Sequence, residues 1–135
     1  MAEDRESVIK TYEDYFLAFQ SLDPEVVVPY YHSPCLFVSP QGVLASTSAT
    51  DTRALLAQMM KGLEARGYAR SEHGPLGVKA LSGYDALLST RVVRYKSDDT
   101  EIEQFGATYT LRKSDTGWKI AVLVVHDSNT VLKLT

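Results

Sequence analysis

Hydrophobic and polar residues alternate most clearly between residues 105 and 127, where the pattern predicts two long antiparallel strands. The apolar positions of the first strand are Phe105, Ala107, Tyr109 and Leu111. The second strand, residues 118–127, is apolar at almost every position, which is typical of a strand covered on both faces. The four residues between them, Ser-Asp-Thr-Gly at 114–117, predict the turn of a β-hairpin.

The length of this turn sets the register of the hairpin, because with four loop residues Lys113 faces Trp118. The expected cross-strand pairs are then Leu111 with Ile120, Tyr109 with Val122, Ala107 with Val124, and Phe105 with His126. Tyr109 and His126 therefore join the apolar inner face. The outer face of the second strand is expected to hold Ala121, Leu123 and Val125. Because such a face is too apolar to leave in water, we expect a homodimer through it.

Three helices are predicted before the long strands. Residues 3–22 carry an apolar stripe at helical spacing, made of Val8, Tyr12, Tyr15, Phe16, Phe19 and Leu22. Asp23, Pro24 and Glu25 then have the order of a helix start, which predicts a short second helix ending near residue 30. The third helix is expected to begin after the capping residues 48–51 and to end at Gly67; its apolar residues are Leu55, Leu56, Met59, Met60 and Leu63.

The remaining strands are shorter and their boundaries come from turn residues. Residues 35–39 and 43–45 predict a short hairpin around Pro40-Gln41-Gly42. Residues 69–73 and 78–81 predict either two strands or one bent strand, and 84–96 a long one. The tail after residue 127 is expected to add a last short strand or to cover a sheet edge. This order predicts an α+β fold and, with no repeat or linker, one domain over residues 1–135.

Composition narrows the class of partner. The chain has 135 residues, 44% hydrophobic and 23% charged, which is ordinary for a globular domain. A net charge of −3 without a cluster of Lys and Arg argues against a nucleic-acid partner. No segment approaches the ~20 apolar residues that span a bilayer, so no membrane partner is expected. The single cysteine, Cys35, and an acidic amino terminus favour a cytoplasmic location.

The order of elements, with Gly117-Trp118-Lys119-Ile120 opening the last strand, resembles the nuclear transport factor two-like superfamily, which includes SnoaL-like and ketosteroid-isomerase-like domains. The resemblance covers nearly the whole chain and rests on element order and turn positions. It implies a cone-shaped, curved antiparallel sheet wrapped around the three N-terminal helices, with a cavity inside. Because that fold carries many functions, the resemblance implies the fold more than the activity.

Residues 22–42 fit the ketosteroid-isomerase pattern without a gap, with these residue types in place: Asp23, Glu25, Tyr31, Pro40 and Gly42. The resemblance places Tyr15 at the oxyanion-binding tyrosine, Tyr109 at the protonated aspartate and His126 at an apolar aromatic of the pocket. The general-base aspartate falls on Ser39, whose hydroxyl is too weak a base without a helper. Steroid isomerisation is therefore not expected, while a cavity with a different lining is.

Tyr15, Tyr109 and His126 are the candidate catalytic residues. A buried phenol without a partner costs on the order of 1 to 3 kcal/mol, so each tyrosine needs a protein group, a water or a ligand. An unperturbed imidazole titrates at about 6.5, so His126 is the candidate acid–base group. The alternative is a core histidine whose hydrogen bonds are satisfied within the protein. The candidate ligand-contacting residues are Phe19, Tyr31, Ser39, Met59 and Arg91.

Arg91 and Arg94 lie on opposite faces of one predicted strand, so only one of them can point into the cavity. Arg91 is the favoured internal charge, with a solvated position as the alternative. No metal is expected because His32 and His73 have no ligand-like spacing to other metal-binding residues. No cofactor is expected either, since the chain lacks a glycine-rich phosphate loop.

Three functions remain open from the sequence. The first is a protein that binds a small apolar or amphipathic molecule in a tyrosine-lined cone. The second is an enzyme of the SnoaL-like cyclase, isomerase or dehydratase kind, in which His126 moves protons and Tyr15 and Tyr109 hold a developing oxyanion. The third is an accessory dimerisation module whose own side chains fill the cone.

Overall fold

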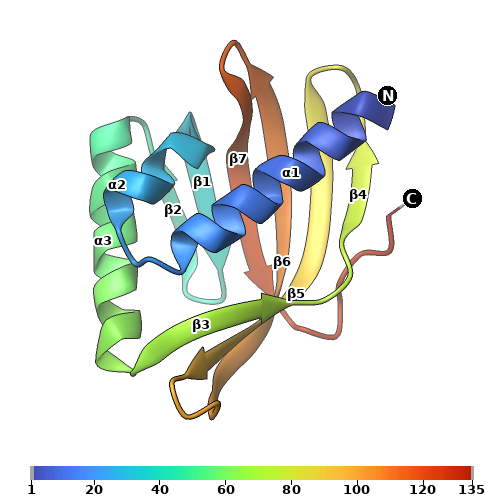
Figure 1. Cartoon of the computed structure of the whole chain (residues 1–135). Coiled ribbons are helices and arrows are strands. Elements are labelled where there is room, and N and C mark those ends of the chain that lie inside the picture. The colour runs from blue at the N-terminus through green and yellow to red at the C-terminus, as the bar shows by residue number, and fades with distance from the viewer. Residues whose placement is uncertain (1, 135) are drawn as a thin grey trace.

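The computed structural model describes residues 2–134, which form three α-helices, a short 3₁₀ helix and seven strands (Figure 1). The helices are α1 (Ala2–Phe19), α2 (Pro24–Val27), the 3₁₀ helix η1 (Val28–Tyr30) and α3 (Ala49–Ala65). The strands are β1 (Tyr31–Ser39), β2 (Gly42–Ser46), β3 (Tyr68–His73), β4 (Gly77–Ala80), β5 (Asp85–Lys96), β6 (Glu101–Ser114) and β7 (Gly117–His126). The predicted α+β order is confirmed. Within residues 2–134 no helix is long and apolar enough to cross a membrane.

The seven strands form one curved, open sheet in the order β2-β1-β7-β6-β5-β3, and β4 also pairs with β5. Every pair is antiparallel except β1 with β7, which run parallel. Strands β3 and β4 are separate and follow one another along β5. Of the two alternatives for this segment, two strands are therefore confirmed. Helix α1 crosses the hollow side of the sheet, and α3 stands beside β1 and β2 (Figure 1).

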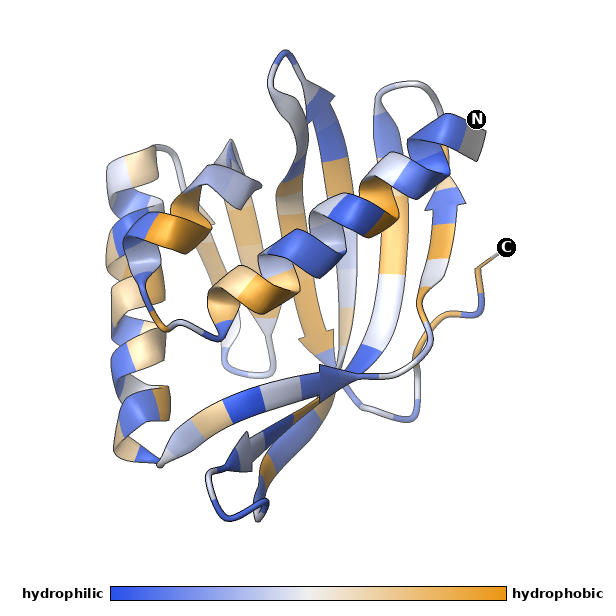
Figure 2. Cartoon of the chain, viewed as in Figure 1, coloured by the Kyte–Doolittle hydropathy of each residue, from blue (hydrophilic) through white to orange (hydrophobic). Residues whose placement is uncertain are grey.

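The core lies between α1 and the sheet because one face of α1 is apolar at helical spacing. The side chains that α1 buries are Val8, Tyr12, Tyr15 and Phe19. The strands behind the helix carry long hydrophobic segments, whereas the outward side of α1 is mostly hydrophilic (Figure 2). Helix α3 begins where Ser48 Oγ accepts a hydrogen bond from the Asp51 N–H at 3.1 Å, and it buries Leu56, Met60 and Leu63.

A β-bulge in β7 changes the register of the long hairpin. Lys113 pairs with Trp118 and Leu111 with Ile120, as predicted. The next partners are Thr110 and Val122, so Ala121 is an extra residue in β7. Because side chains alternate with a period of two, one extra residue turns every later side chain of the strand to the opposite face.

The bulge overturns three expectations about β7. Leu123 is buried and Val125 lies against the hollow side of the sheet, so neither belongs to the outer face. Val122, Val124 and His126 take that place instead. Tyr109 stays on the inner face because its own strand is not bulged, and it pairs with Leu123 rather than Val122. The homodimer itself stays a prediction, with different residues available on the outer face.

His126 belongs to a hydrogen-bonded chain on the outer face of the sheet. Its Nε2 lies 2.7 Å from Thr108 Oγ1, and Thr108 Oγ1 lies 2.8 Å from Ser89 Oγ. Ser89 Oγ in turn accepts from the Leu132 N–H at 2.9 Å. His126 Nδ1 lies 2.9 Å from the Asp127 carbonyl oxygen. The imidazole therefore helps to hold the C-terminal tail on the outer face of the sheet, a satisfied structural role.

We expect Gly106→Ala to destabilise the fold by about 1–3 kcal/mol, the range for overpacking a close contact. A Cβ at Gly106 would lie 2.5 Å from His126 Nδ1 and 2.6 Å from the Asp127 carbonyl oxygen, and the latter is backbone. Urea unfolding followed by circular dichroism measures the loss. The control is Gly62→Ala in α3, where a Cβ meets nothing within 4 Å and helix propensity favours alanine. Equal stability of the two variants would contradict the packing of His126 over Gly106.

Candidate functional site

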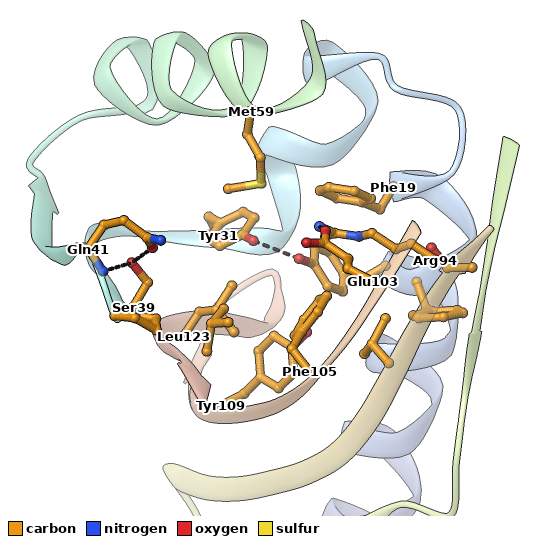
Figure 3. Close-up of a pocket in the computed structure, with 16 residues that line it drawn as sticks. Phe19, Tyr31, Ser39, Gln41, Met59, Arg94, Glu103, Phe105, Tyr109 and Leu123 are labelled. Carbon is orange, nitrogen blue, oxygen red and sulfur yellow. Dashed lines mark hydrogen bonds and ion pairs between the residues drawn. The ribbon is translucent and has the colours of Figure 1, made fainter. Parts of the chain in front are cut away.

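A pocket of about 390 Å³ lies between α1, α3 and the hollow side of the sheet (Figure 3). Its wall is mostly aromatic and aliphatic, with a few polar groups at the floor and the mouth. The lining residues are Tyr15, Phe16, Phe19, Tyr31, Ser39, Pro40, Gln41, Met59, Ser71, Val92, Arg94, Glu103, Phe105, Tyr109, Leu123 and Val125. Phe19 and Met59 lie on the helical side, opposite Leu123 and Tyr109 (Figure 3).

Six of the eight candidate residues from the sequence line this pocket: Tyr15, Phe19, Tyr31, Ser39, Met59 and Tyr109. His126 and Arg91 do not. The expectation for His126 was wrong because the bulge at Ala121 turns it outward. The expectation for Arg91 was also wrong: this side chain is exposed and lies beside the C-terminal tail. Arg94, on the other face of β5, is the arginine that enters the pocket.

Tyrosine side chains form the floor of the pocket. The Tyr15 and Tyr31 hydroxyl oxygens are 2.7 Å apart and hydrogen-bonded. The Tyr109 ring meets the Tyr15 ring edge-on, with 6.0 Å between ring centroids. Below them, the Tyr12 hydroxyl is buried; it forms no hydrogen bond with any described residue, although the Tyr109 phenol is close enough to perturb its pKa. These rings meet because α1 presents residues 12 and 15 on one face, towards the start of β1 and the middle of β6.

Burial raises the pKa of the phenols of Tyr12, Tyr15, Tyr31 and Tyr109 above its ordinary value. For each of them the loss of hydration is the largest cause, because it penalises the charged phenolate. All four are therefore neutral at physiological pH. They offer O–H donors to the pocket and do not act as bases.

A charged group lies at the mouth of the pocket, where β5 and β6 pair. Arg94 Nη1 donates to Glu103 Oε2 at 2.8 Å, and Arg66 Nη1 donates to Glu103 Oε1 at 3.2 Å. Partial burial alone would raise the pKa of Glu103, but the hydrogen bonds and positive charges of Arg94 and Arg66 outweigh it and hold that pKa below its usual value. The Arg94 guanidinium lies 5.3 Å from the Phe19 ring centroid and 4.7 Å from that of Phe105, so aromatic rings support it.

The sequence carried a signal for Arg94 that was not followed. Leu88 and Val92 are buried on the inner face of β5, and an even spacing from them leads to Arg94. Glu103 follows from the same parity, because it is the cross-strand partner of Arg94. Ser39 lines the mouth, where its hydroxyl donates to Gln41 Oε1 at 3.0 Å.

The chemistry of this pocket is that of hydrogen-bond donors beside an apolar wall. Glu103 is the carboxylate of the lining, and two guanidiniums hold it in its ionised form. No imidazole lines the pocket within residues 2–134. In the same range no three His, Cys, Asp or Glu side chains come together as a candidate metal site. The arrangement fits recognition of a ligand with acceptor groups better than abstraction of a proton.

Solved structures with the same fold are numerous. An NTF2-like protein with a cystatin-like fold from Novosphingobium aromaticivorans has a TM-score of 0.77 and 19% identity, covering 96% of this chain and 84% of its own. A protein from Streptomyces avermitilis, proposed as a dehydratase of the NTF2-like family, has a TM-score of 0.73 and 15% identity over 93% and 96%. A ketosteroid isomerase-like protein from Erwinia carotovora atroseptica has a TM-score of 0.66 and 16% identity over 93% and 97%. At these identities the similarity establishes the fold alone.

No curated protein matches the chain. A family model does match: the one described as NTF2-like protein (DUF6841) covers residues 3–128, nearly the whole sequence. This agrees with the curved sheet, the three helices and the structural neighbours. The chain therefore belongs to this NTF2-like family.

Proposed function

We propose that this protein binds a small amphipathic molecule in the tyrosine-lined pocket. The observation that carries the proposal is the convergence of the phenols of Tyr15, Tyr31 and Tyr109 at the floor of an apolar pocket of about 390 Å³. Ligand sites in proteins are typically concave and mostly apolar, with a few polar groups that fix the orientation of the ligand. A pocket of this size also favours binding over the alternative in which side chains fill the cone.

The balance of hydrogen-bond donors and acceptors among the tyrosines indicates which kind of ligand atom would bind at the floor of the pocket. In the pair of Tyr15 and Tyr31, one hydroxyl donates to the other, so one O–H proton of the pair has no acceptor among the described residues. The Tyr109 phenol lies beside those of Tyr12 and Tyr15 and, against the larger effect of burial, lowers the pKa of both, so these three hydroxyls share their protons at the floor. The floor thus holds more phenol O–H donors than acceptors, and a ligand carbonyl or ether oxygen would accept from one of them.

Binding is a better account of the pocket than turnover through His126. The imidazole lies on the opposite face of the sheet and is engaged by Thr108 and Asp127. The groups that line the pocket are phenols with raised pKa and an ion pair, so none titrates near neutrality as an acid–base catalyst would. Two structural neighbours are described as a proposed dehydratase and a ketosteroid isomerase-like protein. Both descriptions name chemistry on small molecules, which supports small-molecule binding in a cavity of this fold.

Filling the pocket is the direct test. We expect Leu123→Trp to weaken binding of the bicyclic ketone 1-tetralone at least ~10-fold, about 1.4 kcal/mol, because the indole occupies the volume the ketone needs. The matched control is Val124→Trp, because Val124 lies on the same strand and its side chain faces outward. The affinity of this variant for 1-tetralone should stay within about 2-fold of wild type. Calorimetric titration measures both, after circular dichroism has shown that each variant is folded. Equal weakening by the two variants would argue against a ligand in this pocket.

The donor role of the floor is tested by Tyr109→Phe. We expect 1-tetralone to bind about 2- to 10-fold more weakly, the loss of one net hydrogen bond of about 0.5–1.5 kcal/mol. Tetralin has the same rings without the carbonyl, so its affinity should not change. If the variant weakened both molecules equally, the phenol would be contributing shape and not a hydrogen bond.

Neutral, buried phenols also predict a loss of stability in alkali. Between the ordinary tyrosine pKa of about 10 and the raised folded value, the unfolded chain binds fewer protons than the folded one, so stability falls as pH rises. Each such phenol contributes a slope of about 1.4 kcal/mol per pH unit above pH ~10. Urea unfolding between pH 9 and 11 should show this slope reduced in Tyr12→Phe and unchanged in Tyr84→Phe, since Tyr84 is exposed. Equal slopes in both variants would show that Tyr12 ionises in the folded state.

A further inference from the structure

We infer that the ligand of this pocket carries a carboxylate, which Arg94 binds at the mouth while the apolar body of the ligand lies against the aromatic wall. This inference rests on the proposed function, because it names the chemical class of the molecule bound there. The observations that support it are the charge balance around Arg94, the unused donors of its guanidinium and the geometry that the neighbouring rings impose.

The charge balance at the mouth is positive. Arg94 and Glu103 are the charged residues that line the pocket within the described chain, and Arg66 also pairs with Glu103. Two guanidiniums therefore share one carboxylate, which leaves one positive charge. Arg70 pairs with both Glu72 and Asp99, a group with one net negative charge, but strand parity places Arg70 and Glu72 on the opposite face from Ser71, the partner of Arg94.

The donors of Arg94 are only partly used. Within residues 2–134 the guanidinium donates one hydrogen bond, from Nη1 to Glu103, and its buried Nε–H has no partner. The side chain is only 15% exposed, so water satisfies little of the remainder. A guanidinium carries five N–H donors in one plane, and a buried donor without an acceptor is costly. A further acceptor at this position would therefore be stabilised.

The rings of Phe19 and Phe105 restrict how that acceptor can approach. Both lie within cation–π distance of the Arg94 guanidinium, so they compete with a ligand for its faces and leave the approach along the plane of the group as the more open one. A carboxylate is planar and has two oxygens at the spacing of the guanidinium fork, which makes it the natural partner for an approach of this kind. The same rings offer an apolar surface to a flat ligand body.

The test compares two probes of nearly equal shape, 2-naphthoate and 2-naphthamide, by calorimetric titration at pH 7.5. We expect wild-type protein to bind the naphthoate about 10- to 100-fold more tightly, the range for a hydrogen bond to a charged group. Arg94→Gln should remove that preference while keeping the amide affinity. Its fold should persist because Glu103 retains Arg66 as a partner. Arg91→Gln is the matched control: it removes a charge from the other face of the same strand and should preserve the preference.

The outcomes separate this inference from the proposed function. If wild-type protein binds both probes with similar affinity, and Leu123→Trp weakens both, the pocket binds ligands but the carboxylate assignment is overturned. If Arg94→Gln keeps the preference for naphthoate, the assignment is equally overturned and Arg94 is a structural ion pair of β5 and β6. If neither probe binds wild-type protein, the inference and the proposed function both fall. The wild-type comparison decides the question even if the Arg94 variant does not fold.

Discussion

A single extra residue in β7 decides which side chains close the pocket. With Ala121 accommodated as a bulge, Leu123 and Val125 turn towards α1, and His126 turns away from it. Without the bulge, the imidazole would enter the cavity and two aliphatic wall residues would leave it. The division of this sheet into a hollow face that lines the pocket and an outer face with a hydrogen-bonded polar chain therefore depends on one local distortion of the ladder.

The inner face of the sheet and helix α1 bury several polar groups. Four phenols and a guanidinium have been taken from water, and hydrogen bonds within the chain repay that cost only in part. The aromatic stripe of α1 makes this arrangement possible, because rings pack edge-on around the hydroxyls and exclude solvent from them. In the proposed function, a ligand that supplies acceptors would stabilise these groups.

Much of the fold follows from the sequence, because periodicity, caps and turns are local. The stripe of α1, the Ser48 cap and the turn before Trp118 all lie where their patterns predict. The bulge could not be read in the same way: residues 118–126 are apolar on both faces, so the sequence shows no break in alternation where the register shifts. This is why Tyr109 was placed correctly and His126 was not. Arg94 could have been found by parity from Val92.

The polar groups of this pocket differ from those of the ketosteroid-isomerase pattern, and the same differences would make the proposed binding site selective. The resemblance to ketosteroid isomerases puts Ser39 and Tyr109 at positions where that pattern has aspartates, and the structure shows the first bonded to Gln41 and the second as a buried neutral phenol. What remains is a set of donors, of which the Tyr12 hydroxyl and the Arg94 Nε–H have no acceptor among residues 2–134. A site of this kind rejects molecules that lack the acceptor, since its polar groups would then stay buried and unpaired. In the proposed function, selectivity for oxygen-bearing ligands would thus follow from the same changes that set this pocket apart from the isomerase pattern.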